Sequence, residues 1–136
     1  MPVRLRIAIR SRLSGKELLV KALVNTGFTS DTPDIAVPVP LAEALGLWPI
    51  PREAISVSME TGGGVVEGYV VPQALVVRVV AEDRVSREVV ANALINPHIG
   101  EVLISDYLAE ELGIQILYPR RGIWRFADEQ RERRSA

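Results

Sequence analysis

The tripeptide Asn25-Thr26-Gly27 has the residue types most relevant to chemistry in this sequence. It directly follows the apolar run at residues 18–24, so we expect it to form a turn that leaves a buried strand. Glycine allows the close backbone approach that such a turn requires. The asparagine amide has nearly the shape of a carboxylic acid, but it cannot act as a general base. Residue 25 can therefore bind through its amide but cannot take up a proton.

Two other candidate sites give weaker signals. Gly62-Gly63-Gly64 lacks a following Lys-Ser or Lys-Thr, so it is not a phosphate-binding P-loop, and we interpret it as the mobile tip of a hairpin. His98 is the only histidine of the chain and stands beside Pro97. Without a second histidine or any cysteine, the sequence predicts no metal site.

The carboxylates and aromatics near these segments have ordinary interpretations. Asp31 and Asp34 follow the Asn25-Thr26-Gly27 turn closely. Their carboxylates either contact basic residues or a substrate, or are solvated in a loop. We favour the solvated loop carboxylates. Asp106 is expected at a helix N-terminus, where a negative charge is favourable. Trp48 and Trp124 are expected in the core or in a dimer interface.

Alternating apolar and polar residues dominate the chain, which is typical of half-buried strands. The sequence predicts one all-β domain at residues 1–127, with one or two short helices, and a polar, flexible tail at residues 128–136. The expected strands are 3–9, 16–24, 35–39, 55–60, 65–71, 74–81, 85–93, 114–118 and 122–126; the helices are 40–45, ended by Gly46, and 106–112, begun by Ser105 or Asp106 and ended by Gly113.

Composition limits the class of protein. The 136 residues include 16 basic and 17 acidic side chains, and the net charge of −1 argues against a nucleic-acid-binding surface. There is no cysteine, no stretch resembling a signal peptide, and no apolar run near the roughly 20 residues that cross a membrane. We expect a cytoplasmic protein without a cofactor, a nucleic-acid partner or a membrane partner.

The sequence contains one internal repeat. Leu41-Ala42-Glu43-Ala44-Leu45-Gly46-Leu47 recurs as Leu108-Ala109-Glu110-Glu111-Leu112-Gly113-Ile114. Short amphipathic helices converge on such residues, but each copy also follows a buried strand end, at Val24 and at Ile104. A two-fold pseudo-repeat of strand, loop and helix is the simpler interpretation.

Residues 22–30, Ala-Leu-Val-Asn-Thr-Gly-Phe-Thr-Ser, resemble the active-site segment of retropepsin-like (clan AA) aspartic proteases, in which apolar residues precede Asp-Thr-Gly. Residues 59–69 resemble the glycine-rich flap of that family. Residues 102–113 match its apolar motif before a short helix, and residues 116–126 resemble the terminal strands of prokaryotic members. The resemblance spans about residues 3–126.

The resemblance implies a closed β-barrel with a flap hairpin that works as a homodimer, each copy supplying one aspartate. Two neighbouring carboxylates share a proton and activate the water that hydrolyses a peptide or protein substrate in the dimer cleft. The resemblance places Asn25 at the position of the catalytic aspartate, with Thr26 and Gly27 shaping the turn. The substrate-binding residues that it implies are Leu23, Thr61, Gly62, Gly63, Gly64, Val65 and Ile104.

Two residues depart from the pattern of the family. Asn25 replaces the catalytic acid, so the chain as written is expected to be inactive or nearly so. Either the aspartate was replaced on purpose, to prevent self-digestion or to trap a ligand, or the chain is a natural pseudoprotease that serves as a dimeric peptide-binding module. Ser105 stands where the family usually has glycine, and its hydroxyl is expected to cap the following helix.

Overall fold

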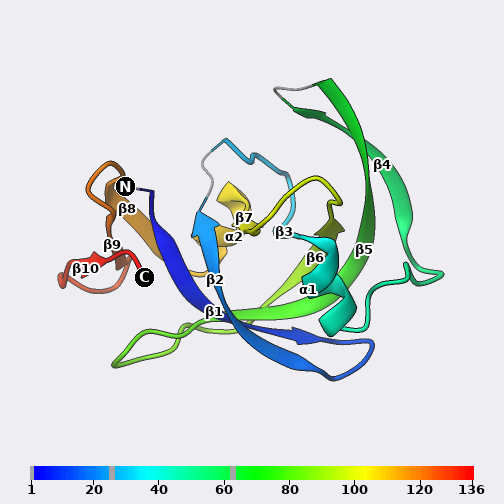
Figure 1. Ribbon diagram of the computed structural model, residues 1–136. Helices are drawn as coiled ribbons and strands as arrows, with labels where there is room; N and C mark the ends of the chain where they lie inside the picture. Colours follow the sequence, from blue (N-terminus) through cyan, green and yellow to red (C-terminus); the bar gives the residue numbers. More distant parts are fainter. Residues whose placement is uncertain (1, 25–26, 62–63) are drawn as a thin grey trace.

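The computed structural model describes residues 2–24, 27–61 and 64–136, and Figure 1 shows their course. Strands make up 50% of it. The elements of the described residues are β1 (Arg4–Ser11), β2 (Glu17–Val24), β3 (Asp34–Val37), α1 (Val39–Ala44), β4 (Ile55–Thr61), β5 (Gly64–Val79), β6 (Val89–Ile95), β7 (Val102–Ile104), α2 (Asp106–Glu111), β8 (Ile114–Tyr118), β9 (Ile123–Phe126) and β10 (Arg133–Arg134).

Six strands of the described chain close into a barrel. Their order is β1–β2–β7–β3–β6–β5, and β5 pairs again with β1 to complete the ring. The pairs β2–β7 and β3–β6 are parallel, and the other pairs of the ring are antiparallel. A closed ring leaves no strand edge open within the barrel. The predicted all-β barrel with short helices is therefore confirmed.

Alternate side chains of the barrel strands fill the interior, as the period of two in the sequence predicts. In β1, Leu5, Ile7 and Ile9 are at most 1% exposed, whereas Arg6 between them is exposed. Burying one such aliphatic side chain stabilises the fold by roughly 1.5–3 kcal/mol. The alternation thus fixes which residues of each strand remain available on the outer face of the barrel.

The sequence repeat corresponds to two equivalent helices. The residue that follows each helix donates its N–H to the carbonyl four residues earlier, and Gly46 and Gly113 come next with φ of +75° and +78°. This left-handed conformation suits glycine and ends a helix. Both helices pack an alanine and leucines of the repeat into the core, and each follows a short strand, β3 or β7.

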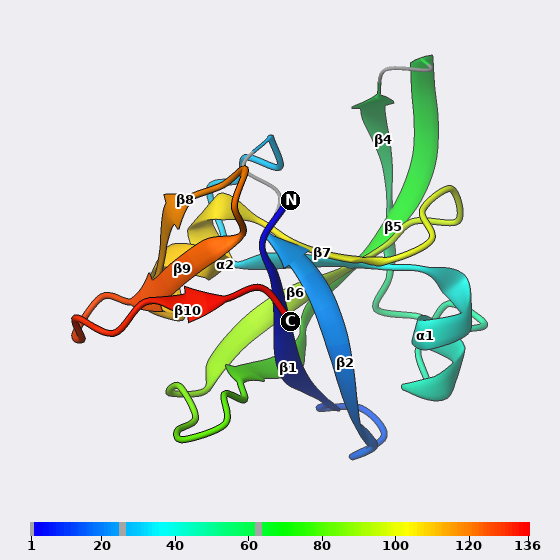
Figure 2. The ribbon, with the colours of Figure 1, turned by 60° about the vertical axis from the view of Figure 1, so that its left-hand side comes forward.

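Strands β4 and β5 form a hairpin that continues the barrel wall outward. Their pairing runs from Ile55 opposite Val70 to Thr61 opposite Gly64. In both views this β4–β5 hairpin and the loop at residues 27–33 project from the same end of the molecule (Figures 1 and 2). Gly62 and Gly63, at the expected tip, lie outside the described residues. The predicted paired strands around the glycine segment are present.

Gly68 allows β5 to pack closely against the side chain of Met59 in β4 and the backbone of β6. A Cβ atom at this position would lie 2.4 Å from Met59 Cε and 3.0 Å from the carbonyl oxygen of Ile95. Met59 can move aside, but the backbone of β6 cannot do so easily. We expect Gly68→Ala to lower the free energy of unfolding by about 1–2 kcal/mol. Urea denaturation measures this loss, and an unchanged midpoint would contradict the close packing.

The C-terminal residues fold back onto the barrel. Strand β10 pairs with β9, and β9 pairs with β8, so residues 114–134 form a small antiparallel sheet. Beyond it, Ser135 Oγ accepts the N–H of Arg4, and Ala136 donates its N–H to the Arg4 carbonyl. The sequence predicts a flexible tail at residues 128–136, whereas the structure packs this segment against β9 and β1. Its polar composition gives no sign of these contacts.

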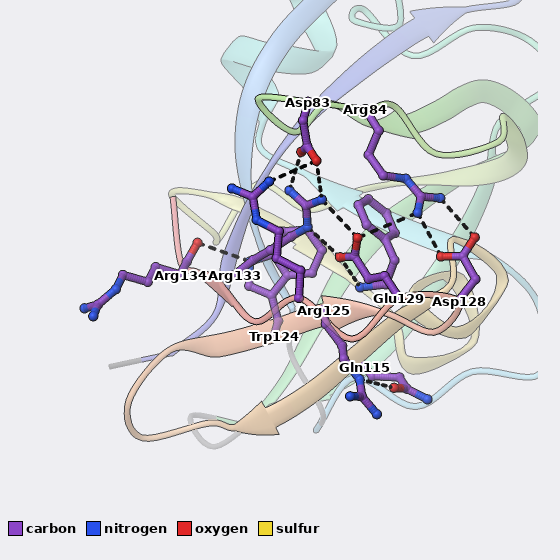
Figure 3. A network of polar contacts seen from close by, with 11 residues as sticks. Asp83, Arg84, Gln115, Trp124, Arg125, Asp128, Glu129, Arg133 and Arg134 are labelled. Atoms are coloured by element: carbon purple, nitrogen blue, oxygen red, sulfur yellow. Dashed lines mark hydrogen bonds and ion pairs between the residues drawn. The ribbon is translucent and has the colours of Figure 1, made fainter.

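A C-terminal ion-pair network accompanies this packing (Figure 3). The guanidinium of Arg133 lies between the carboxylates of Asp83 and Glu129, and the Arg133 side chain is 7% exposed. Arg84 pairs with Asp128, and Arg131 pairs with Asp83. The network joins the loop between β5 and β6 to the end of the chain.

Within the described residues, no helix is long and apolar enough to cross a membrane.

Candidate functional site

The expected catalytic turn follows the end of β2. Asn25 and Thr26 lie outside the described residues, whereas Val24 before them is buried and Gly27 after them is exposed. Val24 lies opposite Ile104 in the parallel pair β2–β7, and Ile104 lies opposite Ile35 of β3. The carboxyl ends of β2 and β7 and the start of β3 therefore meet at one edge of the barrel. This edge is the centre of the candidate site.

Ser105 connects the elements at this edge. Its side chain is fully buried, and its Oγ accepts the N–H of Asp34 at 3.2 Å and the N–H of Leu108 at 3.1 Å. The N–H of Ser105 donates in turn to the Asp34 carbonyl at 3.1 Å. Ser105 thus caps α2, as predicted, and also ties that helix to the start of β3. A glycine here would lack both contacts of the hydroxyl.

The loop at residues 27–33 is held by a cluster of polar side chains, the Asp34 cluster, which consists of Ser30, Thr32, Asp34 and Asn92. The Asp34 carboxylate accepts hydrogen bonds from Ser30 Oγ at 2.5 Å, Thr32 Oγ1 at 2.8 Å and Asn92 Nδ2 at 2.9 Å. Asp34 is half-buried. The interpretation of Asp34 as a solvated loop carboxylate was therefore wrong, and it contacts neutral donors rather than basic residues.

Asp106 fixes the same loop from the side of α2. Its carboxylate oxygen Oδ1 accepts the N–H of Ser30 at 3.1 Å and that of Tyr107 at 2.7 Å, and its own N–H donates to the carbonyl of Phe28 at 2.9 Å. The first turn of α2 is thus stabilised by Asp106, as the sequence predicts. Asp31, by contrast, is exposed and forms no hydrogen bond or ion pair with any described residue.

A row of aliphatic side chains crosses the outer face of the sheet next to this edge. Residues that lie opposite each other in neighbouring strands point to the same face. The strand pairings give six such residues, which we call the aliphatic row: Leu23, Leu103, Ala36, Leu94, Val70 and Ile55. Ala36 is only 3% exposed, so the other five residues form the accessible part of the row. Strands β7, β3 and β6 lie between β2 and the β4–β5 hairpin (Figure 1), so the row runs from the end of β2 to the base of the hairpin.

The row changes the set of candidate binding residues. Leu23, an expected substrate-binding residue, lies in it, but Ile104 is fully buried in the barrel core, and its neighbour Leu103 faces outward instead. Ile104 points into the barrel and Leu103 away from it, because successive side chains of a strand point to opposite faces. Val65 is 70% exposed but lies opposite Glu60, on the hairpin face that does not carry Val70.

The remaining candidates lie elsewhere or have structural roles. Thr61 ends β4 and Gly64 begins β5, at the end of the hairpin. His98 is exposed in the loop after β6, where its N–H donates to Asn96 Oδ1. Trp48 packs against Tyr69 with ring centroids 6.0 Å apart, and Trp124 is a buried core residue. The core interpretation of these aromatics fits both positions.

Sequence reasoning missed Asn92 and Leu103, although both lie at the candidate site. Asn92 stands among the aliphatic residues of β6, where a polar residue signals either an outward position or a hydrogen-bond partner. That signal was available, but its partner Asp34 is 58 positions away and only the fold brings them together.

No protein-family model matches the chain, and a search of curated proteins finds no similar sequence.

Proposed function

We propose that this chain is one subunit of a retropepsin-like aspartic endopeptidase, in which two copies meet about a two-fold axis and bring their residues 25 together. The observation that supports this most is the edge where β2 and β7 end in parallel, just before Asn25-Thr26-Gly27 and before the capped helix α2. A closed barrel with this arrangement and a hairpin at the same end offers the parts that such a site needs.

The reaction needs two carboxylates within hydrogen-bond distance of one water. Close carboxylates cannot both ionise, so one keeps a proton for the carbonyl oxygen of the substrate while the other draws a proton from the water. The amide of an asparagine at residue 25 neither gives up nor takes up a proton at the mildly acidic to neutral pH at which the two carboxylates would act. The chain as written is therefore an inactive form of the enzyme that we propose.

The aliphatic row and the hairpin suit an extended peptide. The hairpin carries Val57, Met59 and Val66 on the same face as Ile55 and Val70, so aliphatic side chains continue from the barrel onto the hairpin. An extended peptide lying along this surface would bury alternate apolar side chains and bond its main chain to the hairpin, which would act as a flap.

Asparagine at residue 25 of the sequence, together with the aliphatic row of the described strands, favours a second function. A natural pseudoprotease would use the dimer cleft and the flap to hold an extended peptide without cutting it. It predicts that the chain as written binds peptides and that the native gene encodes asparagine at residue 25. Peptide affinity alone does not distinguish the two functions, but the codon does.

The test of the proposed enzyme is the variant Asn25→Asp in a peptide-cleavage assay at mildly acidic pH, with sedimentation to establish the dimer. Cleavage above the level of the chain as written supports the proposal. A folded dimer of the Asn25→Asp variant that cleaves no peptide would refute it.

A charge in the aliphatic row should weaken peptide binding. We expect Leu23→Glu to raise the Kd for an extended aliphatic peptide at least about tenfold, because a carboxylate next to an apolar ligand loses hydration without gaining a partner. Leu19→Glu is the matched control, since Leu19 lies on the same strand and face four residues earlier and is 59% exposed. Equal affinities of the two variants in fluorescence anisotropy would exclude the row as the binding surface.

A further inference from the structure

The Asp34 cluster does more than close a local turn, because Asp34 contacts three separate parts of the fold. Its carboxylate accepts hydrogen bonds from Ser30 and Thr32 in the loop that follows Gly27. Its backbone N–H and carbonyl are bonded to Ser105, the cap of α2. Its third side-chain partner, Asn92, belongs to β6 on the side of the barrel that leads to the hairpin.

Asn92 extends this connection to the base of the β4–β5 hairpin. The Oδ1 atom of Asn92 accepts the N–H of Gln73 at 2.8 Å. Gln73 has φ of +50° and lies where the pairing of β5 with β6 shifts between Val71 and Leu75. This irregularity directly follows the part of β5 that forms the hairpin. A chain of hydrogen bonds therefore runs from the loop after Gly27, through Asp34 and Asn92, to the hairpin base.

The chemistry of the contacts indicates why residue 34 is a carboxylate. The donors around it are two hydroxyls and one amide, and no lysine or arginine of the described chain pairs with it. Hydrogen bonds to a charged acceptor are stronger than neutral ones. An ionised carboxylate accepts at both oxygens at once, so a single side chain can orient three donors from two separate segments.

We propose that Asp34 is a positioning residue that sets the loop at residues 27–33 and the hairpin base in a fixed relation across the aliphatic row. The consequence for catalysis rests on the proposed function, because the loop begins directly after Asn25-Thr26-Gly27. The positioning itself is a property of the chain as written and can be measured without any activity.

The first experiment is amide hydrogen exchange on the chain as written. The Thr32 N–H is bonded to Ser30 Oγ, and the Gln73 N–H to Asn92, so these two amides report the two ends of the network. In Asp34→Ala we expect both amides to exchange at least about tenfold faster, the effect of losing hydrogen bonds to a charged group. The Val79 amide, bonded to Ser86 Oγ, should keep its rate.

Three further variants show which contacts of the network cause the change in exchange rates. Asp34→Asn keeps an acceptor oxygen for Thr32 and Asn92 but loses the charge and the second acceptor oxygen, so both rates should lie between those of the protein and those of Asp34→Ala. Asp31→Ala is the matched control, because Asp31 is an exposed carboxylate of the same loop, and it should change neither rate. Asn92→Ala keeps the contacts of Asp34 with the loop but removes the hydrogen bond from Asn92 Nδ2 to Thr32 Oγ1, so it should accelerate exchange at Gln73 more than at Thr32.

The outcomes separate the proposals. Unchanged rates at Thr32 and Gln73 in a folded Asp34→Ala protein would overturn the positioning role. If Asp34→Ala does not fold, an unchanged rate at Gln73 in Asn92→Ala would overturn it, because the link from Asp34 to the hairpin base runs through Asn92. In the Asn25→Asp background, Asp34→Ala should lower kcat at least about tenfold with a smaller change in KM, and Asp34→Asn should restore part of the lost kcat. If Asn25→Asp itself is inactive, the proposed function fails while hydrogen exchange still decides the role of Asp34. Loosened amides with unchanged kcat would refute the catalytic consequence.

Discussion

Asn25→Asp is expected to turn an inactive chain into a peptidase whose cleavage rate is at least about 10³-fold higher at mildly acidic pH. The substitution exchanges one amide nitrogen for oxygen, so it restores a carboxylate with almost no change in volume. Cleavage of a fluorogenic peptide rich in aliphatic residues measures the gain. Because two carboxylates would share one proton, the rate should fall at both more acidic and more basic pH.

A mixing experiment tests whether each active site needs two chains. When the Asn25→Asp variant exchanges subunits with a ninefold excess of the chain as written, about one in ten variant chains remains paired with another variant chain. The activity per variant chain should therefore drop about tenfold. Asn25→Ala is the inactive control of the same length and fold. Activity that is unaffected by the excess chain would show that one subunit suffices, which contradicts the proposed dimeric site.

The elements of the barrel could be predicted because the alternation of apolar and polar residues is strong. Residues 3–9 show it clearly, and β1 has the predicted buried face. In Val102-Leu103-Ile104 every residue is aliphatic, so the sequence alone cannot tell which side chains face inward. The burial of Ile104 and the outward position of Leu103 follow only from the pairing with β2 and β3.

Contacts between distant polar residues could not be predicted in the same way. Strand β5 was expected as two segments, 65–71 and 74–81, but in the structure it is one strand with an irregularity around Gln73. Asn92 bonds the backbone at that point, which allows the strand to continue. The pairs Asp34–Asn92 and Asp83–Arg133 join residues 58 and 50 positions apart. Local patterns carry no information about such pairs before the topology is known.

Arg133→Met should lower the stability of the fold strongly, because it removes the central cation of the C-terminal ion-pair network. The guanidinium forms paired hydrogen bonds with both carboxylates, at 2.6 and 3.0 Å to Asp83 and at 2.6 and 3.1 Å to Glu129. It also lies 5.2 Å from the ring centroid of Phe126 and 5.8 Å from that of Trp124. Methionine keeps the apolar stem but leaves Glu129, which is 16% exposed, without its main partner.

We expect this substitution to lower the free energy of unfolding by about 2 kcal/mol or more at neutral pH, measured by urea denaturation. Arg131→Met is the matched control, because Arg131 pairs with the same Asp83 carboxylate but is 56% exposed. An exposed ion pair contributes little, so this control should barely shift the midpoint. Equal losses in the two variants would show that burial of Arg133 does not matter.

The pH dependence of the same comparison identifies the charges involved. The hydrogen bonds from Arg133 lower the pKa of Asp83 from 3.8 to about 2, and they also hold the pKa of Glu129 below its usual value. The folded state therefore binds fewer protons than the unfolded state in this range, so the stabilisation is complete above about pH 5 and is lost as the pH falls toward 2. The difference in unfolding free energy between the protein and Arg133→Met should accordingly be largest near neutral pH and shrink below pH 4. A difference that stays constant from pH 7 to pH 2.5 would assign the stabilisation to the packing of the arginine stem and the two aromatic rings, and not to the carboxylates.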